Sequence, residues 1–254
     1  MSFEISKYDL LYNSSIPINE FVSIKNPTVE EVSQDKTFNS SSRIFTISTR
    51  EIFSQIPEVD QLEAKYPTIL SILKDPQLEK ENLLGQYFSS GQVTGQQIIS
   101  QSLEFWTGIS QEKFKFLSNG KIICTDPEWI IDEEEFKNIS DLIKTIVSYQ
   151  PNEDFVAPPN MTPTRHKRWM NLFKNRVKKL RNNKTELADK ILVLSVSAGG
   201  YIPIDEIRKM TYFHFCKLNI LLAEKEAYEL HWQIKTSPNF EVKDKLKHWK
   251  DIVI

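Results

Sequence analysis

The sequence predicts an α+β fold that is mainly helical, with small N-terminal strands, a central β-hairpin packed with helices, and an all-helical C-terminal module. Two observations carry most of this prediction. Several stretches place apolar residues at helical spacing, three or four positions apart. The pair Asn119-Gly120 separates two short apolar runs, which is a strong local indication of a hairpin.

The first part of the chain is expected to contain short elements. Residues 8–24 resemble short extended pieces joined by a turn. Thr28 and Glu31 have the spacing of a capping box, so a short helix is expected to begin after Thr28. Residues 33–60 are less regular, and 43–48 within them resemble a brief strand.

Two helical regions are expected before the hairpin. Apolar residues recur at helical spacing over 59–73, where Pro67 predicts a kink or two short helices. A further helix is expected over 94–107, because Thr94 can cap its start and Gly108 can end it.

The hairpin is expected near 113–124, with a type I′ turn at Asn119-Gly120. Asp132 can then cap a helix whose first turn carries three glutamates. Carboxylates favour the positive end of the helix dipole, so these acids need no metal to explain them.

A proline-rich stretch marks the predicted domain boundary. We expect an α+β domain over 1–150, a linker over 151–164 and a helical module over 165–254. The linker is assigned because this stretch has four prolines, at 151, 158, 159 and 163, and little that could pack.

The C-terminal module is expected to contain several helices. Its first helix is basic with one apolar stripe, and Thr185 can cap the next. A short helix over 205–210 and a long one over 211–234 follow. An amphipathic piece over 242–254 closes the chain. The stripe of the basic helix consists of Trp169, Leu172, Phe173, Val177 and Leu180.

Charge is distributed unevenly along the chain. The segment from Arg165 to Lys184 contains nine cations and no acid. Because the whole chain carries −2 and this segment carries +9, the remainder carries −11. A basic segment on an acidic chain can meet an acidic partner, nucleic acid or the protein's own acidic surface. The candidate partner-binding residues are Arg165, Lys167, Arg168, Trp169, Lys174, Arg176, Lys178, Lys179 and Arg181.

Three interpretations of the basic segment remain open. It can be a solvated helix face, although cations without acids forgo the pairing that stabilises such faces. It can bind nucleic acid, with the cations on phosphates and Trp169 stacking on a base. It can also dock on an acidic protein surface, including this protein's own.

Signatures of catalysis are absent from the sequence. No glycine-rich phosphate loop or nucleophile elbow occurs, and no histidine pair has the spacing of a zinc helix. We therefore expect a protein that is not an enzyme and that needs no cofactor or metal. Only Cys124 and Cys216 are present, far apart, which favours a reducing, intracellular setting.

The order of these elements resembles the tail assembly chaperone-like proteins of phages and prophages of Gram-positive bacteria. The resemblance covers most of the chain and is weakest over 32–108. Its motifs begin with YDLLY at 8–12 and VSIKNPTVEEV at 22–32, and continue with FLSNGKII at 116–123 and IDEEEF at 131–136. The basic stretch, LAD at 187–189, MTYFHF at 210–215 and HW at 248–249 complete them.

The resemblance implies a non-enzymatic factor of bacteriophage tail morphogenesis. Such a protein binds the tape-measure protein or tube subunits in the host cytoplasm and keeps them soluble until assembly. The same resemblance also allows a baseplate or connector component that stays in the virion. A nucleic-acid-binding regulator that uses 165–184 is a further alternative, with nucleic acid the less favoured partner. Self-association is left open, and no membrane contact is expected.

Overall fold

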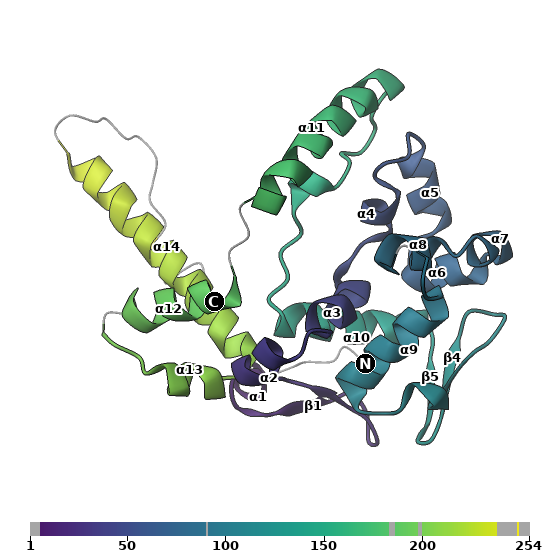
Figure 1. Ribbon diagram of the computed structural model, residues 1–254, viewed down its shortest axis with the longest axis horizontal. Coiled ribbons are helices and arrows are strands. Elements are labelled where there is room, and N and C mark those ends of the chain that lie inside the picture. Colours follow the sequence, from purple (N-terminus) through teal and green to yellow (C-terminus); the bar gives the residue numbers. More distant parts are fainter. Residues whose placement is uncertain (1–5, 90, 183–185, 198–199, 238–247, 249–254) are drawn as a thin grey trace.

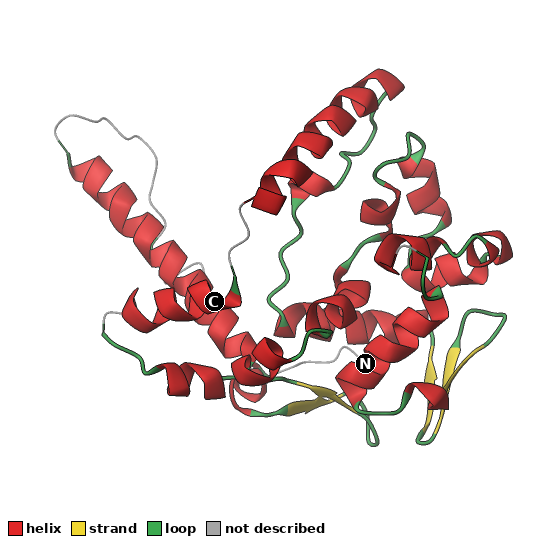
Figure 2. Cartoon of the chain, viewed as in Figure 1, coloured by secondary structure: helices red, strands yellow, loops and turns green. Residues whose placement is uncertain are grey.

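The computed structural model describes residues 6–89, 91–182, 186–197, 200–237 and 248. Within them the chain is mainly helical, with two small antiparallel sheets, as the sequence predicts. Figure 1 shows a body of packed helices from which α11 (Pro163–Asn182) and α14 (Tyr212–Thr236) extend as two long arms. Figure 2 shows the strands at one edge of this body.

The first elements form a small hairpin preceded by a helix. Strands β1 (Ser15–Pro17) and β2 (Ser23–Lys25) pair antiparallel. The expectation of extended chain from residue 8 is wrong, because α1 occupies Lys7–Tyr12. The Ser6 hydroxyl accepts a hydrogen bond from the Tyr8 N–H and so caps a helical turn at this point.

Three short helices follow: α2 (Val29–Gln34), α3 (Phe38–Thr46) and α4 (Thr49–Phe53). The predicted capping box at the start of α2 is present. The brief strand expected over 43–48 is wrong, because most of it belongs to α3. The buried side chains of α3 recur at helical spacing, and its small serines allow close packing. These side chains include Phe38, Ser41, Ser42 and Phe45.

The chain then forms four short helices around a break. The break predicted at Pro67 separates α5 (Val59–Lys65) from α6 (Ile69–Lys74), which confirms two short helices. Helices α7 (Pro76–Lys80) and α8 (Leu83–Ser89) follow without a counterpart among the sequence predictions.

Helix α9 (Gly95–Thr107) is the central helix of the body. Its predicted capping box and its Gly108 end are both present, with Gly108 at a φ of 73°. Trp106 is fully buried, and its Nε1–H donates to the Ser41 carbonyl of α3 at 3.1 Å. Helices α3 and α9 therefore share both apolar contacts and a buried hydrogen bond.

The predicted hairpin is confirmed as β3 (Phe114–Phe116) and β4 (Ile122–Thr125), preceded by a short 3-10 helix. A third strand, β5 (Glu128–Ile131), pairs antiparallel with β4. The type I′ turn is wrong, because Gly120 has a positive φ of 79° but Asn119 does not. A longer loop with a single left-handed glycine joins the strands instead.

Helix α10 packs against α3, and the C-terminal helices follow it. The terminal helix predicted over 242–254 and the cap predicted at Thr185 lie outside the described residues. The remaining elements are α10 (Glu133–Ile146), the 3-10 helix η2 (Glu153–Phe155), α11 (Pro163–Asn182), α12 (Leu187–Ser197), α13 (Ile204–Lys209) and α14 (Tyr212–Thr236).

The C-terminal helices join the N-terminal part through backbone and side-chain contacts. The Tyr212 N–H donates to the Pro27 carbonyl at 2.7 Å, and the Val29 N–H donates to the Met210 carbonyl at 3.0 Å. Phe213 belongs to the main buried cluster, which includes residues of α1, α3, α9 and α10. The division into domains at 151–164 stays a prediction.

Candidate partner-binding surface on helix α11

Helix α11 begins where the proline-rich stretch ends. Pro163 occupies its first turn, where a missing N–H costs no intrahelical hydrogen bond. The Thr162 hydroxyl accepts a hydrogen bond from the Arg165 N–H at 3.4 Å, and the Thr162 carbonyl accepts one from the His166 N–H at 2.9 Å. These two bonds stabilise the change from extended chain to helix.

The inner face of α11 is aromatic. His166 and Trp169 are buried and Phe173 is half-buried, at the spacing of one helix face. The ring centroids of Trp169 and Phe173 are 5.1 Å apart, and Phe155 of η2 meets Phe173 edge-on at 5.8 Å. This ring stack lies against the rest of the protein.

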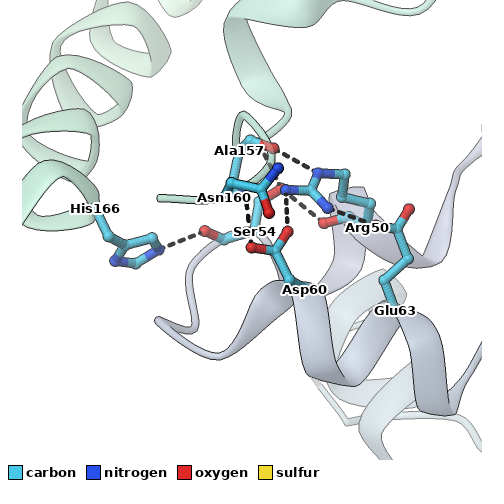
Figure 3. Close-up of polar contacts among 7 residues, drawn as sticks. All are labelled: Arg50, Ser54, Asp60, Glu63, Ala157, Asn160 and His166. Carbon is cyan, nitrogen blue, oxygen red and sulfur yellow. Dashed lines mark hydrogen bonds and ion pairs between the residues drawn. The ribbon is translucent and has the colours of Figure 1, made fainter. Parts of the chain in front are cut away.

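Arg50, a half-buried residue, connects α4 to α5 and to the stretch before α11 (Figure 3). The Arg50 side chain is 12% exposed and uses all three of its nitrogens. Nε donates to the Ala157 carbonyl at 2.6 Å, Nη1 to Glu63 at 2.5 Å and Nη2 to Asp60 at 2.8 Å. We call this group, together with Ser54, Asn160 and His166, the Arg50 anchor.

The other members of the Arg50 anchor extend the contact to α11 itself (Figure 3). The Ser54 hydroxyl accepts from the Ala157 N–H at 2.9 Å, and the Ser54 carbonyl lies 3.0 Å from His166 Nε2. The Asn160 N–H donates to Asp60 at 3.0 Å. The stretch before α11 is therefore bonded to the α4 and α5 region through the N–H and the carbonyl of the buried Ala157 and through the Asn160 N–H.

The electrostatic surroundings favour the charged forms of Arg50 and Asp60. Burial alone would lower the pKa of Arg50, but the hydrogen bonds to Asp60 and Glu63 outweigh it and raise that pKa. The hydrogen bond from Arg50 lowers the pKa of Asp60. The guanidinium and the Asp60 carboxylate thus stay ionised near neutral pH, which suits a structural contact.

The outer face of α11 is cationic and exposed. None of its six exposed cations forms an ion pair within the described part of the chain. We define these six as the cationic face: Arg165, Lys167, Arg168, Lys174, Lys178 and Lys179.

Helix geometry divides the cationic face into two rows. Successive residues turn by about 100° in an α-helix, so positions seven and eleven apart fall near one line. Asn171 and Asn175 lie between the rows and are exposed. One row is Lys167, Lys174 and Lys178, and the other is Arg165, Arg168 and Lys179.

The remaining predicted partner-binding residues lie elsewhere. Trp169 is only 7% exposed and belongs to the inner ring stack. Arg176 is half-buried and bonded to Asp154, through both a carboxylate contact at 2.9 Å and the Asp154 carbonyl at 2.9 Å. The side chain of Arg181 and all of Lys184 lie outside the described residues.

Reactive or metal-binding groups do not gather in the part of the chain that the structure describes. No three residues among its histidines, cysteines and acids are placed to hold a metal ion. Burial lowers the pKa of His214 and raises the pKa of the Cys216 thiol, which makes that thiol a poor nucleophile. Nor does any described helix combine the length and apolar character needed to cross a membrane.

Comparisons with known proteins do not place this chain in a family. No protein-family model matches it, and neither a curated protein nor a solved structure is significantly similar to it.

The Arg50 anchor has no signal in the sequence. Arg50 and Ala157 are 107 positions apart, and Ser54 and His166 are 112 apart. Arg50 belongs to no local motif, and only the folded chain brings its partners together. The cationic face, in contrast, is evident from the run of unpaired cations in the sequence.

Proposed function

We propose that this chain is a non-enzymatic protein-binding factor that docks on an acidic protein surface through the cationic face of α11. The observation that carries this proposal is a face of exposed cations that form no ion pair with any described residue, on a helix bonded to the body through the Arg50 anchor. Solvent-exposed cations on a positioned helix attract acidic partners and orient their approach.

The partner that we propose is a bacteriophage tail protein, either the tape-measure protein or a tube subunit, bound during assembly in the host cytoplasm. The supporting observation is the resemblance of the sequence motifs to tail assembly chaperone-like proteins. Retention in the virion as a baseplate or connector component is the alternative form of the same proposal. The presence of the chain in purified particles distinguishes the two.

Protein is favoured over nucleic acid by the position of Trp169. Binding of single strands without sequence preference relies on aromatic side chains that stack on bases, together with cations. Trp169 is buried against Phe173, so the cationic face offers charge without an aromatic platform. Retention on DNA that weakens steeply with salt and is lost on changing Lys178 and Lys179 to alanine would instead support a nucleic-acid-binding regulator.

Co-purification with tape-measure or tube protein tests the proposal. The triple variant Lys167→Glu, Lys174→Glu, Lys178→Glu should lose the complex, because it reverses one whole row of the cationic face. The matched control changes Lys7, Lys36 and Lys80 to glutamate, which alters the net charge equally at exposed positions elsewhere. Equal retention of both tail proteins by the two triple variants would refute the docking role of α11.

A further inference from the structure

A hollow of about 740 Å³ lies behind α11, on the side away from most of the cationic face. Its walls come from α3 and α4, from the chain over 147–155, and from α11, and Tyr87 of α8 and Tyr212 of α14 also line it. Most of this lining is apolar or aromatic. A hollow of this size and lining is typical of sites that receive a bulky apolar group.

One end of the hollow carries a charged group. Arg43 of α3 donates to the Tyr87 hydroxyl at 3.2 Å and lies 5.5 Å from the centroid of that ring. Its contact with the Glu51 carboxylate is long, at 3.5 Å, and the Arg43 side chain is 55% exposed. Burial raises the pKa of Glu51, although Arg43 opposes that shift. Arg43 therefore has N–H groups that donate to no other described residue and can meet a further acceptor.

Helix α11 supplies both apolar wall and cations at this site. Phe173 and Val177 line the hollow from its inner face. Lys174 precedes Val177 by three positions, so these two residues are neighbours on the helix surface, although Lys174 does not itself line the hollow. An apolar group inside the hollow would thus have Arg43 in the wall around it and Lys174 next to the Val177 wall.

We infer that this hollow receives a large apolar side chain, aromatic or aliphatic, from an acidic segment of the protein partner, with carboxylates beside it that meet Arg43 and Lys174. The inference rests on the proposed docking function and specifies the kind of segment that docks. An apolar anchor in a pocket supplies most of the affinity in many protein interfaces, while surrounding charges set orientation and partner choice. Here the hollow is the pocket for the apolar anchor, and the cations are the charges that set orientation and partner choice.

Three synthetic peptides test this inference on the full chain. The first has one phenylalanine between glutamates, the second has serine in place of phenylalanine, and the third has glutamines in place of the glutamates. Val177→Trp narrows the hollow from its wall. Leu172→Trp, at a position 54% exposed on the outer face of the same helix, is the matched control. Arg43→Gln removes the charge at the far end.

Fluorescence anisotropy should show the phenylalanine peptide binding about tenfold more tightly than the serine peptide, the factor expected when a ring leaves water. Val177→Trp should reduce this preference, and Leu172→Trp should keep it. Arg43→Gln should weaken binding of the first peptide, which has glutamates, and should leave binding of the glutamine peptide unchanged.

Two different results separate the inference from the function on which it rests. Equal binding of the phenylalanine and serine peptides, with both still dependent on glutamate, would overturn the hollow as a binding site and leave acidic docking intact. Equal binding of the glutamate and glutamine peptides would overturn the proposed docking function itself. Loss of the phenylalanine preference in Leu172→Trp as well would place the apolar contact outside the hollow.

Discussion

Single side chains determine how the arm formed by α11 is positioned. Ser54 uses its hydroxyl to accept from the Ala157 N–H and its carbonyl to contact His166. The Arg50 guanidinium bonds to the same residue, because its Nε donates to the Ala157 carbonyl. Because Ser54 and Ala157 are both 1% exposed, water cannot replace these hydrogen bonds when one partner is removed.

Replacing Ser54 by alanine should therefore destabilise the protein. The substitution leaves the buried N–H of Ala157 without an acceptor, which costs about 1–3 kcal/mol. Urea unfolding measures the loss. Ser40→Ala, at an exposed position of α3, is the control and should change stability little. An unchanged unfolding midpoint in Ser54→Ala would show that this hydrogen bond is unimportant.

Asp75 should make the free energy of unfolding depend on pH under acidic conditions. The hydrogen bond from the Tyr66 hydroxyl, together with backbone N–H groups of α7 and Lys65, lowers the pKa of Asp75 from 3.8 to about 2. A group whose pKa is lower in the folded state stabilises the fold above its unfolded pKa. That contribution is present above pH 3.8 and is lost as the pH falls towards about 2.

Asp75→Asn tests this dependence through unfolding midpoints measured across that pH range. The variant should be less stable near neutral pH and should lose less stability on acidification than the wild type. Glu112→Gln, at an exposed carboxyl, is the control and should keep the wild-type pH profile. Parallel pH profiles for wild type and Asp75→Asn would contradict the assignment.

At the scale of elements, local signals predicted the helices whose ends are capped. Helices α2 and α9 begin at the capping boxes that the sequence contains, and α9 ends at a left-handed glycine. Helix α3 lacks a side-chain cap, and its serines gave no local indication of a helix. It is stabilised by packing against α9 and α10, which a local pattern does not reveal.

The cap of α9 has a measurable energetic role. Thr94 accepts a hydrogen bond from the Gln97 N–H, and the Gln97 side chain accepts one from the Thr94 N–H. Thr94→Ala should therefore lower the free energy of unfolding by about 1 kcal/mol. Thr145→Ala, at an exposed position within α10, is the control for loss of a threonine away from a helix start. Equal effects of the two substitutions would contradict the role of the cap.

At the scale of the whole molecule, the C-terminal helices contact the N-terminal elements. The start of α14 pairs with the residues around Thr28, and the Thr211 hydroxyl donates to the Leu10 carbonyl at 3.0 Å. Phe213 is 4% exposed within the main buried cluster. The stability of the N-terminal elements should thus depend on the C-terminal helices.

Phe213→Ala tests this dependence. Removing a buried ring should cost about 3–5 kcal/mol, and amide hydrogen exchange should then quicken in α9 and α10 as well as in α14. Leu230→Ala, at a position 57% exposed near the far end of the same helix, should change stability by less than about 0.5 kcal/mol. Faster exchange confined to α14 would show that the C-terminal helices are energetically independent.

The sequence by itself determined the helical character of the chain, the capped helix starts, the central hairpin and the cations of α11. Each of these depends on residues close together in the chain, where hydrogen bonds and periodicity act locally. Only the tertiary structure decided that Trp169 is buried, that α3 is a helix, and that Arg50 contacts Ala157. These features depend on residues far apart in sequence, whose contacts form only when the whole core is assembled.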